Sequence, residues 1–163
     1  MFEIDPVTFL MSCILMCAFS VPFIYNGQKN KKIARTLMAK LNELAQLKGA
    51  NPTEIDIWRF RYALGLDVSQ NVLVYLCQDT TSVSYSLNLA DFKTVRLIKK
   101  YQELNGKSQK QKLPEYLALE LVPVDSVAQV VSLELYDGEL FSDLMGETVL
   151  ADKWVGILNK QLN

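Results

Sequence analysis

Two kinds of hydrophobic pattern divide the chain. The first is a run without charge from Val7 to Tyr25, which as a helix would rise about 28 Å and just cross the hydrocarbon core of a bilayer. The residues before it include Glu3 and Asp5 but no Lys or Arg, which argues against a cleaved signal peptide because such peptides begin with basic residues. The pattern therefore predicts a single transmembrane helix within residues 1–28.

Basic residues follow this run and set its expected orientation. Directly after Tyr25 come Lys29, Lys31, Lys32 and Arg35, whereas the opposite flank is acidic. The positive-inside rule then places the N-terminus outside and the main domain in the cytoplasm. We expect a single-pass protein of a bacterial inner membrane.

Helical spacing continues beyond the uncharged run. Apolar residues recur at three- and four-residue steps from Lys29 to Lys48, and Gly49 is suited to end a helix. This predicts an amphipathic linker helix over residues 29–50, with six Lys and Arg against one Glu. Such a helix could lie on an anionic leaflet, where each nearby cation gains about 1 kcal/mol, could dock on a partner, or could pack on its own domain.

After Pro52 the hydrophobic period changes from 3.6 to 2, which is typical of strands with one wet face. Alternation is clearest over residues 83–89, 117–121 and 131–135. Further strands are expected at Tyr62–Val68 and Val72–Cys77, joined by a tight turn, and at Thr94–Tyr101, with residues 55–60 offering a seventh.

Helical spacing returns over residues 148–162, where one apolar side would bury Trp154. An amphipathic helix after an antiparallel sheet most economically covers that sheet. We therefore expect an α+β domain over residues 51–163, an antiparallel barrel or sheet of six or seven strands with a C-terminal helix. This architecture resembles a pleckstrin-homology-like domain.

Several segments spread along the chain carry a further likeness. They are Pro22-Phe23-Ile24-Tyr25, Glu54-Ile55-Asp56-Ile57-Trp58, Gly65-Leu66-Asp67, Leu133-Glu134-Leu135-Tyr136, and Gly146-Glu147 followed by Ala151-Asp152-Lys153-Trp154. Through these segments nearly the whole chain resembles a group of uncharacterised single-pass membrane proteins of Bacteroidetes-type bacteria. The resemblance implies that a membrane span and a domain act as one unit, and it carries over no activity, cofactor or catalytic residue.

The chain contains no histidine, which excludes Ser-His and Cys-His nucleophilic catalysis and imidazole-ligated metals. Cys77 lies in an apolar run and is interpreted as a buried structural thiol. The densest carboxylate group, Asp137-Gly138-Glu139 with Asp143 and Glu147, lacks the spacing of an EF-hand and is interpreted as a solvated turn. No catalytic residue, cofactor or metal site is predicted.

Charge is segregated although 17 Lys and Arg nearly balance 18 Asp and Glu. A segment from residue 93 to 112 is basic, and residues 115–152 hold nine acids and no base. We expect no nucleic-acid binding, because the remainder is acidic and no RNP-like motif is present. The residues predicted to contact a membrane surface or partner are Lys29, Lys31, Lys32, Arg35, Lys93, Arg96, Lys99 and Lys100; those predicted to form an interaction edge are Trp58, Arg59, Arg61 and Tyr62.

These features favour an interaction protein over an enzyme. The functional hypothesis is a non-enzymatic, membrane-anchored cytoplasmic module, an accessory subunit of or adaptor to an inner-membrane protein assembly. Its expected partners are the bilayer, through Val7 to Tyr25, and a membrane protein. The alternatives are a domain that binds anionic lipid surfaces and, less favoured, an enzyme that works without histidine.

Overall fold

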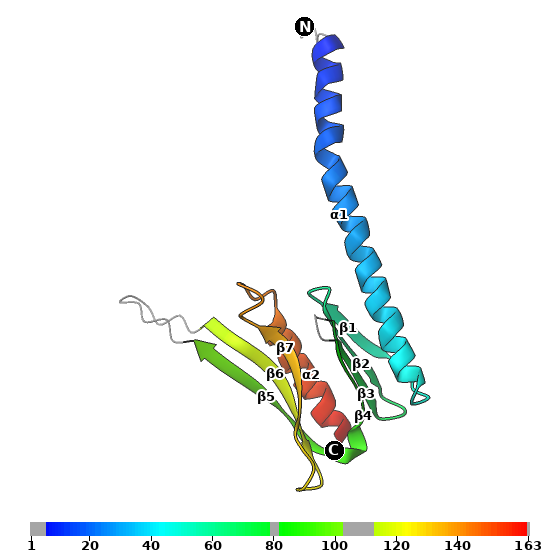
Figure 1. Ribbon diagram of the computed structural model, residues 1–163, viewed down its shortest axis with the longest axis vertical. Helices are drawn as coiled ribbons and strands as arrows, with labels where there is room; N and C mark the ends of the chain where they lie inside the picture. Colours follow the sequence, from blue (N-terminus) through cyan, green and yellow to red (C-terminus); the bar gives the residue numbers. More distant parts are fainter. Residues whose placement is uncertain (1–5, 79–81, 103–112, 163) are drawn as a thin grey trace, which may run out of the picture.

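The computed structural model describes residues 6–78, 82–102 and 113–162 of the chain (Figure 1). A long helix is followed by strands and a closing helix. In chain order the elements are α1 (Pro6–Gln46), β1 (Glu54–Trp58), β2 (Tyr62–Asp67), β3 (Val72–Cys77), β4 (Val83–Asn88), the short 3-10 helix η1 (Leu89–Asp91), β5 (Phe92–Gln102), β6 (Leu113–Pro123), β7 (Val131–Asp137) and α2 (Glu147–Leu162).

The strands form two separate antiparallel sheets, one ordered β1-β2-β3-β4 and the other β5-β6-β7. The prediction of one pleckstrin-like barrel or sheet of six or seven strands is therefore wrong. The chain changes direction at η1, where the Asn88 side chain accepts a hydrogen bond from Ala90 N and Leu89 N donates to Asn71 O. This corner leads β5 away from β4 and into the second sheet. The alternation of residues within a strand does not indicate where the chain passes from one sheet to another.

The main core lies between the inner faces of the two sheets and is closed by α2. It includes Leu64 and Leu73 of the first sheet and Leu119 and Leu133 of the second, all fully buried. Trp154 of α2 is also fully buried, as the helical pattern predicted, and its Nε1 donates to Asp56 Oδ2 at 2.9 Å. This hydrogen bond satisfies the indole N–H that burial would otherwise leave without a partner.

A second core lies on the outer face of the four-stranded sheet, under the C-terminal part of α1. Leu37, Leu41 and Ala45 of α1 are fully buried there against β2 and β3. The basic helix was expected to lie on lipid, dock on a partner or pack on its own domain, and the structure shows the last of these for its C-terminal part. The helices predicted over residues 1–28 and 29–50 are joined in the single helix α1.

The membrane-spanning prediction is not supported. Within the described residues, no helix combines the length and apolarity needed to cross a membrane. The prediction rested on the absence of charge from Val7 to Tyr25, but these residues form only the first part of a helix that runs on through the basic residues to Gln46. This finding contradicts the transmembrane helix and, with it, the single-pass inner-membrane localisation and the orientation inferred from it.

The β5 edge of the second sheet is partly covered by α2. Asn159 of α2 accepts a hydrogen bond from Val95 N through Oδ1 and donates to Val95 O through Nδ2, both at 2.9 Å, as a neighbouring strand would. Further along the same edge, Lys99 of β5 pairs with Asp152 of α2 at 3.6 Å. The helix therefore closes part of an edge that would otherwise be open to another strand.

Candidate interaction surfaces

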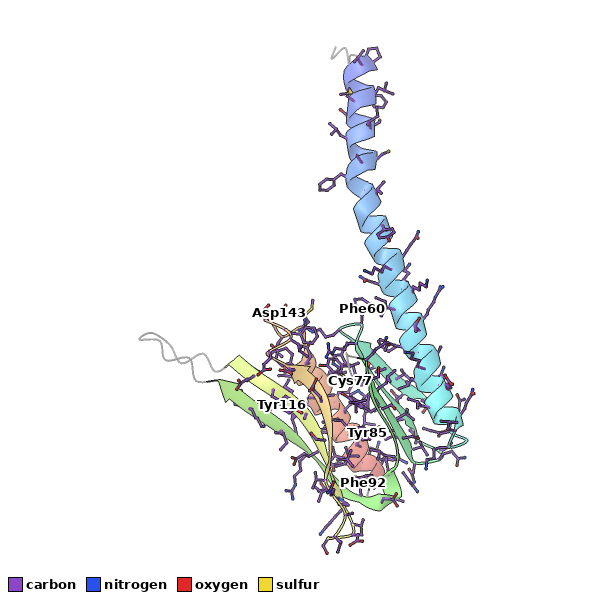
Figure 2. The ribbon with its side chains drawn as sticks, viewed as in Figure 1. Phe60, Cys77, Tyr85, Phe92, Tyr116 and Asp143 are labelled. Carbon is purple, nitrogen blue, oxygen red and sulfur yellow. The ribbon has the colours of Figure 1, made fainter. Side chains whose placement is uncertain are left out.

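The first part of α1 projects beyond the β domain and exposes large apolar side chains (Figures 1 and 2). We call residues 7–25 the apolar segment. Exposure reaches 73% for Phe19 and 75% for Met16. Among the side chains that the structure describes, the segment's other exposed large hydrophobic residues are Val7, Phe9, Leu10, Met11, Ile14, Leu15, Val21 and Tyr25.

Apolar side chains surround this part of the helix. Because a helix turns roughly 100° per residue, Ile14 points about 140° away from both Phe9 and Phe19, which are themselves about 80° apart. All three are exposed. A helix that is apolar on all sides is normally enclosed by other protein or lipid, whereas a surface helix has one apolar stripe.

Basic residues follow the apolar segment along α1. Lys29, Lys31, Lys32 and Arg35, here called the basic collar, are all exposed. Among the residues that the structure describes, none of the four forms an ion pair. The collar therefore keeps its charge available to an external group.

The other predicted basic contacts lie elsewhere. They belong to β5, in the second sheet, whereas α1 packs on the first sheet, and Figure 1 shows the two elements on opposite sides of the domain. Lys93 and Arg96 are exposed, Lys99 pairs with Asp152, and Lys100 Nζ lies 5.4 Å from the centre of the Tyr116 ring. The structure does not bring the eight predicted residues into one basic surface.

The predicted interaction edge lies at the tight turn between β1 and β2. Arg59 and Phe60 adopt positive φ angles of 53° and 51°, and Arg61 N donates to Trp58 O at 3.2 Å. A left-handed conformation costs a residue with a side chain about 1–2 kcal/mol, and glycine would avoid this cost. Two such residues in succession mean that surrounding contacts hold the turn.

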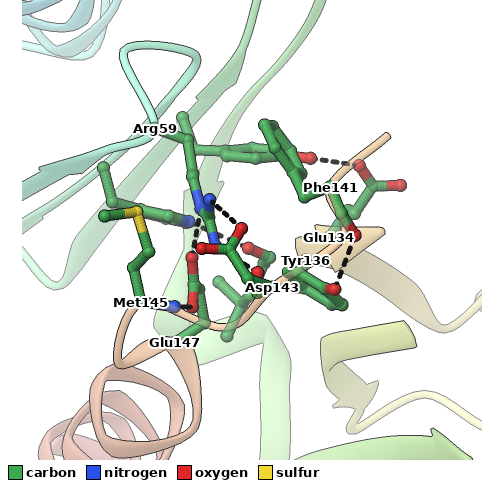
Figure 3. A network of polar contacts seen from close by, with 10 residues as sticks. Arg59, Glu134, Tyr136, Phe141, Asp143, Met145 and Glu147 are labelled. Atoms are coloured by element: carbon green, nitrogen blue, oxygen red, sulfur yellow. Dashed lines mark hydrogen bonds and ion pairs between the residues drawn. The ribbon is translucent and has the colours of Figure 1, made fainter. Parts of the chain in front are cut away.

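The contacts that hold it come from the loop before α2 and from the start of α2 (Figure 3). Arg59 Nε donates to Glu147 Oε1, and its other nitrogens donate to Oδ1 and to the backbone oxygen of Asp143. The guanidinium also lies over the Phe141 ring, 4.7 Å from its centre. Burial alone would lower the pKa of Arg59, but the hydrogen bonds to Glu147 and Asp143 outweigh it and leave the pKa raised.

Glu147 is almost completely enclosed, with 3% of its side chain exposed, and the Arg59 side chain is 9% exposed. The second carboxylate oxygen of Glu147 accepts from Met145 N at 2.5 Å. The two ends of the Glu147 carboxylate thus bind the turn and the loop before α2. This role differs from the solvated acidic turn predicted around Glu147, because nothing in the local pattern links residues 59 and 147.

Trp58 and Tyr62 also connect the two sheets. Trp58 Nε1 donates to Leu135 O at 2.9 Å, and Tyr62 OH donates to Glu134 Oε1 at 2.7 Å. Their rings stack with centres 5.3 Å apart. Burial, followed by the hydrogen bond to Glu134, raises the pKa of Tyr62, so its hydroxyl stays protonated as a donor.

The exposed part of this turn is Phe60, a residue that was not among the predicted contacts. Phe60 is 49% exposed, and Met145 is 76% exposed. Together with Leu150 they line a shallow pocket of about 550 Å³ beside the buried ion pair. Of the predicted edge residues, Trp58, Arg59 and Tyr62 therefore act mainly inside the molecule, while the outward surface of the turn belongs to Phe60.

The three cysteines differ in setting. Cys13 and Cys17 are free thiols exposed on the apolar segment, one helical turn apart. Cys77 is buried, and burial raises the pKa of its thiol, which disfavours the reactive thiolate.

No family model, no curated protein and no solved structure matches the chain.

Proposed function

We propose that this protein is an interaction module that inserts the apolar segment of α1 into a helical protein assembly and holds its β domain beside it. The observation that carries the proposal is the apolar segment itself, exposed on all sides of a helix whose other end is fixed to the domain. Exposed apolar surface of this extent marks a binding site in a folded protein. A helix apolar on all sides needs more than one neighbouring helix to enclose it.

The division of α1 supports the same proposal. Leu37, Leu41 and Ala45 fix the helix on the sheet, whereas the apolar segment extends beyond the domain. Binding to the segment therefore leaves the β domain folded and positions it at a fixed distance from the partner. This is the arrangement expected of an adaptor or accessory subunit.

An anionic lipid surface, the alternative predicted from charge, has less support. Adsorption to such a surface is favoured when many cations share one face. The collar on α1 and the cations of β5 lie on different sides of the domain (Figure 1). The enzyme alternative stays a prediction that no structural observation favours.

The test uses the two thiols of the apolar segment as reporters in the full chain. Extracts of cells that make the protein are labelled with a maleimide, and the labelling rates of Cys13 and Cys17 are compared with those of the purified chain. Docking predicts strong protection in the extract and rapid labelling of the chain alone. Cys77 is the internal reference, because it is buried and reacts only after unfolding.

A matched pair of variants makes the test specific. Leu15→Glu places a charge in the apolar segment, while Val127→Glu makes the same type of change at an exposed apolar residue, 87% exposed, in the β6–β7 loop. The first change should abolish protection of the thiols and the second should leave it intact. A wild-type chain recovered from gently lysed cells as a solitary monomer, with freely reacting thiols, would refute the proposal.

A further inference from the structure

The basic collar lies directly between the apolar segment and the part of α1 that packs on the sheet. Its four cations are exposed and, among the described residues, form no ion pair. In the sequence, α1 carries no acid before Glu43. Any protein that encloses the apolar segment must therefore also face a concentrated positive charge where the helix leaves it.

From this charge we infer that the partner presents Asp and Glu carboxylates around the mouth of its helix-binding site, opposite Lys29, Lys31, Lys32 and Arg35. The inference rests on the proposed docking of the apolar segment and adds the chemistry of the partner to it. Carboxylates at this position would pair with the collar, whereas an uncharged or basic mouth would leave like charges or unpaired cations at the interface.

The charge of the collar also disfavours a second copy of this chain that lies parallel to the first. Packed helices lie about 8–10 Å apart, which is comparable with the screening length at physiological ionic strength. Parallel copies joined along their apolar segments would hold one collar beside another with no acid of α1 near them. The charge therefore favours an acidic partner over a parallel pair of copies.

The collar also defines how deeply the helix enters its binding site, which apolar contact alone does not. Contact among apolar side chains is not directional, so a uniformly apolar helix has no preferred depth in its binding site. Charges at residues 29–35 pair only when the helix has entered as far as residue 25. Pairing at the mouth thus fixes the depth of insertion and, with it, the position of the β domain.

Two synthetic peptides of roughly 20 residues, long enough to cover the apolar segment as a helix, test the partner's chemistry. Both have the same Leu- and Ala-rich stretch, and they end in a glutamate-rich or a lysine-rich tail. The purified full chain is titrated with each, and protection of Cys13 and Cys17 from maleimide is measured. We expect the glutamate peptide to protect at about tenfold lower concentration at low salt, as several surface ion pairs together would produce.

Charge reversal with a matched control assigns the effect to the collar. Lys29→Glu with Lys32→Glu should remove or invert the preference for the glutamate peptide. Lys40→Glu with Lys48→Glu changes the net charge equally at exposed positions nearer the domain, and should leave the preference intact. Raised salt should reduce the difference between the peptides for the wild-type chain.

The outcomes separate this inference from the proposed function. Equal protection by the two peptides, or an unchanged preference after collar reversal, would overturn the acidic mouth while leaving apolar docking intact. Failure of both peptides, together with unprotected thiols in cell extracts, would count against docking itself. Sedimentation that shows the purified chain as a stable oligomer with protected thiols would identify a second copy instead, and protection by anionic vesicles alone would identify a lipid surface; either result overturns the inference.

Discussion

The attachment of α1 to the domain depends on the absence of a side chain at Gly65. A Cβ atom at this position of β2 would lie 2.9 Å from Leu41 Cδ2 of α1 and 3.2 Å from Pro52 Cβ. Leu41 is fully buried, so it has little freedom to move away. Gly65→Ala should therefore overpack the contact between α1 and the sheet.

The size of the effect follows from this geometry. An inserted methyl group in a filled core costs about 1–3 kcal/mol. Truncation of a buried leucine, Leu41→Ala, costs about 2–5 kcal/mol because it leaves a cavity. The double variant places the new methyl group against the space vacated by Leu41, so its cost should fall below the sum of the single costs by about 1 kcal/mol or more.

Urea unfolding of the full chain measures these free energies. The control is Gly156→Ala in α2, where a Cβ would meet no atom within 4 Å. There the alanine should be neutral or should stabilise the helix by up to about 1 kcal/mol. Additive costs at Gly65 and Leu41, or a stabilising Gly65→Ala, would refute the close contact between α1 and β2.

Three further predictions test the β domain. Arg59→Met leaves the Glu147 carboxylate buried without its partner and should lower the unfolding free energy in urea by about 3–5 kcal/mol. The control Asp143→Asn, at an exposed carboxylate, should lower it by less than about 1 kcal/mol. Similar losses for the two variants would contradict the buried pair. The pKa of Asp67 is lowered to about 2 by hydrogen bonds from Ser69 and from the backbone of Asn51, so its contribution to stability should be lost as pH falls from about 4 towards 2. Asp67→Asn should make the loss of unfolding free energy over this range smaller than in the wild-type chain, in urea titrations at each pH. Phe60→Gly relieves a left-handed φ and should raise the unfolding free energy by about 1 kcal/mol; a destabilised variant would show that Phe60 supports the fold.

Local pattern predicted the elements well where one period held over the whole segment. The strands expected at Tyr62–Val68 and Val72–Cys77 correspond to β2 and β3, and their tight turn gives the register Asp67 to Val72. The helix expected over residues 148–162 is α2, with Trp154 fully buried. Periodicity shows which face of an element is apolar, and in each of these segments one period holds throughout.

The relation between elements was harder to predict because it depends on contacts far apart in the chain. The corner at η1, which separates the sheets, is formed by a capping side chain of Asn88 and leaves no trace in residue alternation. Arg59 and Glu147 are 88 positions apart, and each looks like an ordinary surface charge in its own segment. The apolar segment was recognised from composition, but composition did not show that its helix continues to Gln46 and packs on the sheet.

The length of α1 gives the molecule a mechanical property. From Pro6 to Ile33, the first α1 residue that packs on the sheet, the helix extends about 40 Å. A rotation of about 10° at the packed end would therefore move the tip by about 7 Å, taking the helix as a rigid rod with the usual rise per residue. Force applied at the tip is likewise multiplied at the contact between Leu41 and Gly65. The helix is thus a lever that pivots on the second core, under the C-terminal part of α1. Movement of a bound partner would strain the contact between Leu41 and Gly65.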